Sequence, residues 1–160
     1  MLFRSGVTYY RTGDLVEVNP ENLRWIRYIT RVGRTYKVGG EFINPDVIEE
    51  ALGVAFPRLA TDPKGYLFAV TGADQADGNK KTVLFTTRNL SVLEANQGAM
   101  AQGLKPIERI HKVYHVDAIP MAGSGKVALS TIARWGAELE NLDASHHSED
   151  LKKALAGALR

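Results

Sequence analysis

The sequence predicts an α+β domain, with a small, mostly antiparallel sheet and helices packed against it. Two pairs of β-rich runs are each separated by a turn-rich connection, which is the pattern of antiparallel hairpins. Other stretches have apolar residues at helical spacing and begin at recognisable N-caps. The order of these strands and helices predicts an α+β domain.

Length and composition limit the class of protein. The 160 residues suffice for one ordinary domain with a core and little more. Twenty basic residues nearly balance eighteen acidic ones, so we expect no nucleic-acid partner. The absence of cysteine excludes disulfides, thiolate metal sites and a cysteine nucleophile. We find no signal-peptide core and no apolar run of about 20 residues, and therefore expect a cytoplasmic protein without a membrane span.

The first β-rich pair lies near the N-terminus. Residues 15–18 and 23–29 flank the turn-forming segment 19–22, which predicts a hairpin. A lone hairpin is only marginally stable in water, so this one is expected to join a sheet. The following residues, 30–40, carry glycines among basic residues and are interpreted as a linker that runs into a loop.

A helix is predicted directly after this linker. Asn44 is a favourable N-cap, Pro45 suits the first helical position, and Asp46 interacts well with the positive end of the helix dipole. The expected apolar face consists of Val47, Ile48, Ala51 and Leu52.

The second β-rich pair consists of residues 66–71 and 82–87. Both runs show little polar alternation, as expected of a hairpin whose two faces are covered. Ser91 and Glu94 then have capping-box spacing, which predicts a helix to about residue 102. The residues of this helix expected to pack are Leu93, Met100 and Ala101.

The last third of the chain contains a further β-type run and two further predicted helices. Residues 110–116 form another β-type run, and residues 127–135 are predicted to begin a helix. Ser148 is a candidate cap for a final amphipathic helix through Leu159. We find no internal repeat or low-complexity tract.

The loop at 119–129 is the first candidate site. Pro120, Gly123 and Gly125 bracket a polar turn that ends in a single lysine, Lys126, after which a helical pattern begins. Glycines allow backbone N–H groups to approach an oxyanion, and the lysine adds a compact positive charge, so the loop suits a phosphate or carboxylate. The alternative is a connector with a solvated lysine.

Two further clusters precede that loop. Asp14 follows a Thr-Gly turn and precedes a strand, a position in which a carboxylate can accept two hydrogen bonds from a sugar diol; Thr-Gly-Asp is also common turn chemistry. Arg31, Arg34 and Lys37 lie close together in sequence, either as an anion site or as a solvated basic linker.

Other chemistries are disfavoured. Residues 123–126 do not form a P-loop, because Pro120 stands where the motif needs glycine and Val127 where it needs serine or threonine. His111 and His115 would share a strand face but lie too far apart for an easy metal site, so no metal site is predicted. No local signature supplies a base for Ser124 as a nucleophile.

Taken together, these motifs resemble one family. Residues 10–14, an arginine before a short linker, residues 37–52 and residues 120–126 occur in the order and at the spacings of the C-terminal part of adenylate-forming acyl-CoA synthetases, the AMP-binding ligases. The resemblance covers roughly residues 9–135. Details at 31–37, 83–87 and 123–126 look most like the acyl-acyl-carrier-protein synthetase domain of bacterial 2-acylglycerophosphoethanolamine acyltransferases.

The resemblance implies a role for each motif. Asp14 would bind the ribose hydroxyls of ATP and of the acyl adenylate, and Arg31 would also contact the nucleotide. Lys126 would bridge the substrate carboxylate and the α-phosphate. The loop that shapes the thiol-acceptor tunnel would be Gly39, Gly40 and Glu41. The complete enzyme would use ATP with Mg²⁺, and CoA or an acyl carrier protein as acceptor.

Two departures from the family matter. The family usually has glycine where Thr30 stands and aspartate or lysine at the hinge, where this chain has Gly33. The large N-terminal adenylation domain has no counterpart in this sequence, so the expected organisation is a hairpin segment of that domain (1–30), a lid domain (31–136) and a helical tail (137–160). We expect the chain to be inactive alone and to bind no cofactor stably by itself.

A second hypothesis from the sequence belongs to another class of function. In it the chain is a non-catalytic interaction module that pairs with a partner, or with a second copy, through an exposed edge of the 15–29 hairpin.

Overall fold

The computed structural model describes residues 2–4, 7–9, 12–31, 33–75 and 78–144. By its internal contacts the chain divides into two compact units, Met1–Thr35 and Tyr36–Arg160. The final helix predicted from Ser148 lies outside the described residues. None of the helices within the described ranges is long and apolar enough to cross a membrane.

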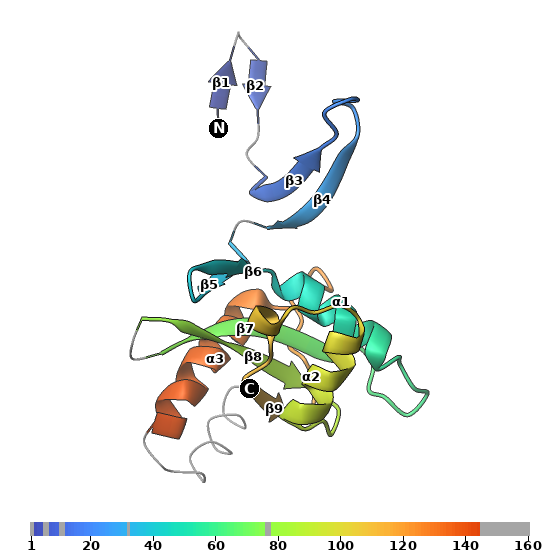
Figure 1. Cartoon of the computed structure of the whole chain (residues 1–160), viewed down its shortest axis with the longest axis vertical. Coiled ribbons are helices and arrows are strands. Elements are labelled where there is room, and N and C mark those ends of the chain that lie inside the picture. The colour runs from blue at the N-terminus through green and yellow to red at the C-terminus, as the bar shows by residue number, and fades with distance from the viewer. Residues whose placement is uncertain (1, 5–6, 10–11, 32, 76–77, 145–160) are drawn as a thin grey trace. The chain divides into compact units, whose positions relative to one another are not determined.

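The first unit consists of two antiparallel hairpins (Figure 1). Strand β1 (Leu2–Arg4) pairs with β2 (Val7–Tyr9), and β3 (Asp14–Val18) pairs with β4 (Ile26–Arg31). The second hairpin confirms the prediction, including the turn after Val18, where the Asn19 side chain accepts hydrogen bonds from the backbone N–H groups of Glu21 and Asn22.

The second unit is built on a three-stranded sheet. Strand β8 (Lys80–Thr86) lies between β7 (Phe68–Asp74), which is antiparallel to it, and β9 (Lys112–His115), which is parallel. This confirms the predicted hairpin. Among the strand pairs of the described residues, β8–β9 alone is parallel, which agrees with the predicted mostly antiparallel fold. The strands extend further into the connection than the sequence suggested, because Asp74 still pairs with Lys80.

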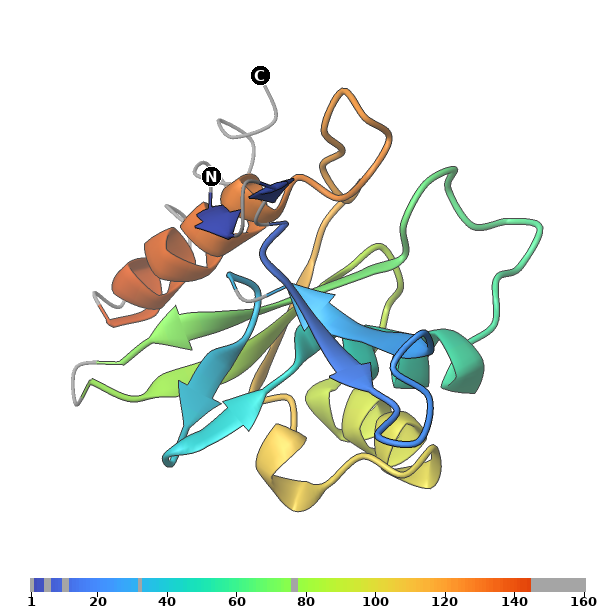
Figure 2. The ribbon, with the colours of Figure 1, turned by 90° about the horizontal axis from the view of Figure 1, so that it is seen from above.

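Helices cover both faces of this sheet (Figure 2). On one face α1 (Pro45–Ala55) and α2 (Val92–Ala101) pack on side chains such as Val70 and Leu84. On the other face α3 (Leu129–Ala144) packs Trp135 against Phe85 with ring centroids 5.5 Å apart. Burial of both faces explains why β7 and β8 lack polar alternation.

The starts of α1 and α2 agree with the sequence, α3 begins at Leu129 rather than at the predicted Val127, and some predicted faces were wrong. Asn44 caps α1 by accepting from the Asp46 backbone, and α2 begins with the predicted capping box of Ser91 and Glu94. Val47 is exposed, as are the three α2 residues expected to pack, Leu93, Met100 and Ala101. The buried face of α2 instead uses Ala95 and Ala99, because small side chains allow α2 to lie close to α1.

The predicted linker also contains structure that the sequence analysis missed. Strand β5 (Tyr36–Val38) pairs with β6 (Glu41–Ile43) around a two-residue turn. A 3₁₀ turn, η1 (Pro106–Glu108), precedes β9. Strands of three residues are too short to produce a recognisable alternating pattern, so the pair was interpreted as loop.

Candidate functional site

Lys126 lies on a small hairpin-like loop just before α3. The backbone N–H of Ala122 donates to the Lys126 carbonyl at 2.7 Å, and Gly125 N–H donates to the Ala122 carbonyl at 2.9 Å. Gly125 has a φ of +77°, the left-handed conformation that closes such bulged loops and favours glycine. An antiparallel bridge between Met121 and Val127 closes the base. Lys126 is therefore exposed on a loop with a defined backbone.

The glycine motif forms the tip of the β5–β6 hairpin. Gly39 and Gly40 are its two central residues, with φ of +55° and +88°, as a type I′ turn requires. Glu41 is exposed and faces Val38 across the pair. Sequence analysis found these residues but not the hairpin that presents them.

Asp14 and Arg31 are cross-strand partners in the first unit. They pair in the β3–β4 register, and Arg31 Nε lies 3.0 Å from Asp14 Oδ1. Thr12 Oγ1 accepts from the Asp14 backbone N–H at 3.2 Å, and Gly13 has a φ of +78°. The predicted pair of nucleotide contacts is thus brought together, with the carboxylate oriented by the guanidinium.

The structure does not gather the candidate residues of the second unit into one place. The orange loop that carries Lys126 and the cyan β5–β6 hairpin lie on opposite sides of this unit (Figure 2). Gly33, the predicted hinge position, is exposed and belongs to the first unit, three residues before Tyr36. The second unit therefore offers two separate surfaces, one with a cation and one with a glycine turn.

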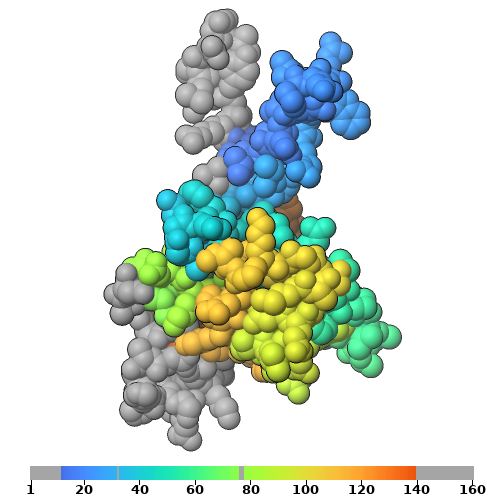
Figure 3. All heavy atoms as spheres, in the orientation of Figure 1, coloured from blue at the N-terminus to red at the C-terminus, as the bar shows by residue number. Residues whose placement is uncertain are grey.

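A hollow of about 390 Å³ adjoins the glycine hairpin. It is lined by Val38, Pro106, Ile107, Arg109 and His111. Figure 3 shows the gold segment that includes η1 beside the cyan hairpin, and a Cβ added to Gly39 would lie 3.8 Å from Ile107 Cδ1. Sequence reasoning missed Arg109 as a candidate and considered His111 only as a metal ligand. Neither stands in a local motif, and only the fold brings them to the hairpin.

His111 also has a structural role in this hollow. The ring Nδ1 of His111 accepts from the Thr82 backbone N–H at 3.2 Å, and the backbone N–H of His111 donates to the Thr82 carbonyl at 2.9 Å. Arg109 Nε lies 3.4 Å from His111 Nε2, so the two polar residues of the hollow contact each other.

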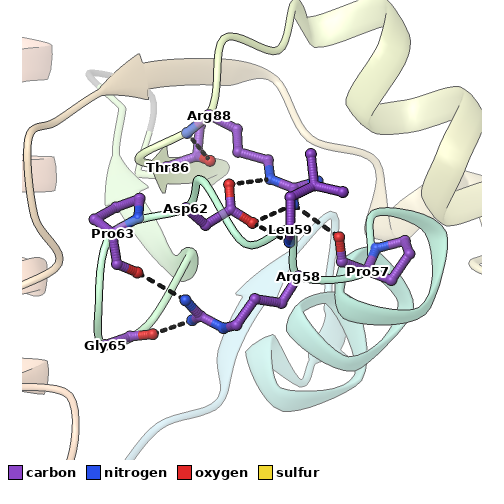
Figure 4. A network of polar contacts seen from close by, with 8 residues as sticks. All are labelled: Pro57, Arg58, Leu59, Asp62, Pro63, Gly65, Thr86 and Arg88. Atoms are coloured by element: carbon purple, nitrogen blue, oxygen red, sulfur yellow. Dashed lines mark hydrogen bonds and ion pairs between the residues drawn. The ribbon is translucent and has the colours of Figure 1, made fainter.

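A polar network holds the long loop between α1 and β7 (Figure 4). The Arg88 side chain pairs with the Asp62 carboxylate and donates to the Pro57 carbonyl at 2.7 Å. Asp62 also accepts from the Leu59 backbone N–H at 2.6 Å. The hydrogen bonds from Arg88 and Leu59 lower the pKa of Asp62 below its ordinary value.

This loop lies next to the loop of Lys126. Arg58 donates to the carbonyls of Pro63, at 2.7 Å, and Gly65. A Cβ added to Gly65 would lie 3.7 Å from the sulfur of Met121, so the two loops touch.

No protein-family model matches the chain. Among curated proteins, it is 30% identical over 123 residues to the 4-coumarate–CoA ligase-like protein 3 of Oryza sativa subsp. japonica, an alignment that covers 74% of this chain and 19% of that protein. The chain thus spans about a fifth of the length of this relative.

Solved structures match over most of the chain. ATP-bound MatB from Rhodopseudomonas palustris matches with a TM-score of 0.61 and 20% identity, over 82% of this chain and 25% of that one. o-Succinylbenzoate CoA synthetase (MenE) from Bacillus subtilis, in complex with the acyl-adenylate intermediate OSB-AMP, matches with a TM-score of 0.62 and 23% identity, over 81% and 25%. The fold is the α+β fold of the C-terminal domain of adenylate-forming enzymes.

Proposed function

We propose that this chain is the C-terminal lid part of an ATP-dependent, AMP-forming ligase. The complete enzyme would adenylate a carboxylic acid, with a fatty acid as the first candidate, and transfer the acyl group to the thiol of CoA or of an acyl carrier protein. The observation that carries the proposal is the exposed Lys126 on its glycine-closed loop, in a chain with this fold. The Asp14–Arg31 pair and the glycine hairpin support it.

Lys126 would serve the adenylation step. This step brings a carboxylate to a polyphosphate, so two anions must approach each other. An ammonium between them offsets their repulsion and the charge that develops in the transition state, most strongly where water is excluded. Asp14, oriented by Arg31, would accept hydrogen bonds from the ribose hydroxyls.

The second half-reaction would use the other surface. A domain that rotates can serve two reactions in turn, because each of its two orientations presents a different face to the partner domain. The glycine turn at 39–40 and the adjoining hollow with Arg109 would then face the thiol acceptor. Gly33 suits a hinge because glycine tolerates large changes of φ and ψ.

An N-terminal adenylation domain, in cis or in trans, is part of the proposal. Mg²⁺ usually binds through substrate phosphates and one or two carboxylates. The described residues contain no group of three acidic or histidine side chains placed to hold a metal. We therefore assign Mg²⁺ to ATP and the N-terminal domain, and expect the chain alone to bind no nucleotide stably.

Complementation tests the proposed function. The chain is mixed with a lid-deleted N-terminal adenylation domain, ATP, Mg²⁺ and fatty acids, and pyrophosphate release is followed. We expect the chain to restore release, Lys126→Ala to abolish most of this rescue, and Lys64→Ala, which removes another exposed lysine, to retain it. Failure of the wild-type chain to rescue, or equal rescue by Lys126→Ala, contradicts the proposal.

One observation favours a second function, self-association through the first unit. In the described part of the chain β3 and β4 pair only with each other. Their hairpin exposes Leu23, Trp25 and Ile26 to 75%, 72% and 63%. Unpaired strand edges with apolar side chains recruit further strands. Light scattering tests this function: it predicts a mass that rises with concentration, and a strictly monomeric chain contradicts it.

A further inference from the structure

One aromatic side chain holds the base of the glycine hairpin on the central sheet. Tyr36, the first residue of β5, is 8% exposed, and its hydroxyl donates to Thr82 Oγ1 at 3.0 Å. Thr82 is fully buried on β8 and pairs with Gly72 on β7. A Cβ added to Gly72 would lie 2.5 Å from Tyr36 Cγ, so the ring occupies the space that glycine leaves. The side chain thus spans both strands.

The rest of the hairpin is held less firmly. Ile43, the cross-strand partner of Tyr36, is buried, but Lys37, Phe42 and Glu41 are exposed. The tip meets the body of the unit near Ile107. Val38, next to the tip, also packs against the core but is only half-buried, so the buried Tyr36–Ile43 pair is the firmer attachment of the hairpin.

Tyr36 also stands where the second compact unit begins, three residues after Gly33. A change in the backbone conformation at Gly33 would be transmitted to the sheet through the contacts of Tyr36. Contacts that tie Tyr36 to both Gly72 and Thr82 let the hairpin and the sheet move as one body.

We propose that Tyr36 is a positioning residue for the thiol-transfer step. This inference rests on the proposed function. Tyr36 contacts no substrate; it fixes the Gly39–Gly40 turn relative to the sheet, so that the turn meets the acceptor in a defined place. The adenylation step uses the Lys126 loop on the opposite side of the unit and does not depend on this contact.

Amide hydrogen exchange of the chain alone tests the anchor. Tyr36→Phe and Thr82→Val each remove the hydroxyl contact and keep nearly the same side-chain shape. Loss of one net hydrogen bond, about 1 kcal/mol, predicts roughly fivefold faster exchange at residues 36–43, with α3 unchanged. Tyr66→Phe removes a more exposed hydroxyl, on a residue outside the hairpin, and is expected to exchange like the wild type. Unchanged exchange in the hairpin, or equal acceleration throughout the unit, overturns the proposal.

The two half-reactions test the consequence. In an enzyme completed with an N-terminal domain, Tyr36→Phe is expected to slow thioester formation severalfold and to leave pyrophosphate release unchanged. Equal loss in both steps, or in neither, overturns the positioning role. If the wild-type chain supports no pyrophosphate release, the proposed function fails and the role in thiol transfer fails with it, while the exchange result still decides whether Tyr36 anchors the hairpin.

Discussion

At the scale of single residues, Lys126 is proposed to act in the adenylation step while contributing little to the stability of the fold. Its side chain is exposed, and its loop is closed by backbone hydrogen bonds that do not involve the ammonium group. We expect Lys126→Ala to change the free energy of unfolding by less than about 0.5 kcal/mol. The rescue of pyrophosphate release should nevertheless fall by roughly 10²- to 10³-fold, as for other groups that stabilise developing charge. Urea denaturation beside the complementation assay separates the two effects, and a large loss of stability would argue for a structural lysine.

Gly40 is expected to be sensitive for a conformational reason. Its φ of +88° is unfavourable for a residue with a Cβ, although the space around it is open. Gly40→Ala should therefore destabilise the hairpin by about 1 kcal/mol. Gly33→Ala is the matched control, because Gly33 also has open surroundings but no positive φ. Amide exchange at residues 36–43 measures the difference, and equal behaviour of the two variants would contradict it.

At the scale of elements, α1 and α2 meet through a glycine. A Cβ added to Gly98 would lie 2.5 Å from Phe56 Cε2 and 3.1 Å from Ala55 Cβ. Gly98→Ala gains about 1 kcal/mol of helix propensity but is expected to lose about 1–3 kcal/mol through overpacking. Gly53→Ala, on the exposed side of α1, should show the gain alone. Urea denaturation gives both values, and a stabilising Gly98→Ala would show that Phe56 moves aside freely.

Local sequence signals predicted element starts better than element faces. The N-cap of α1 and the capping box of α2 depend on residues next to each other in sequence, and both were predictable. The buried face of α2 depends on what α1 presents to it, which explains why alanines are buried and Leu93 is exposed. The β5–β6 hairpin was missed because its strands gain stability from Tyr36 on the sheet rather than from their own pattern.

The loop between α1 and β7 is expected to lose stability in acid. The hydrogen bonds from Arg88 and Leu59 lower the pKa of Asp62 below its ordinary value of 3.8. Asp62 therefore stabilises the fold above its ordinary pKa, and this contribution is lost as the pH falls through its lower, folded-state pKa. The difference in melting temperature between the wild type and Asp62→Asn should be largest at neutral pH and narrow below about pH 4. A constant difference from pH 7 to pH 3 would contradict this role.

At the scale of the whole molecule, the sequence is enough to name the candidate residues, but not to predict how they are arranged. Short sequence motifs contain Asp14, Arg31, the glycine turn and Lys126, and the order of these motifs can be read directly from the sequence. That Asp14 and Arg31 form an ion pair follows from strand register. That the glycine turn and the lysine loop face opposite sides of the second unit follows from packing around the sheet. Arg109 reaches the hairpin only through this packing.

The distribution of buried side chains predicts that the second unit folds without the first. Both clusters of buried apolar residues consist entirely of residues from Tyr36 onward. A chain shortened to residues 34–160 is therefore expected to keep its urea midpoint, whereas the isolated hairpins should be unstable in water. The tryptophans report this directly, because Trp25 is 72% exposed and Trp135 is 2% exposed. Removal of residues 1–33 should leave only the blue-shifted emission of Trp135, as Trp25→Phe does in the full chain. A lower midpoint of the shortened chain relative to Trp25→Phe would show that the first unit contributes to the stability of the second.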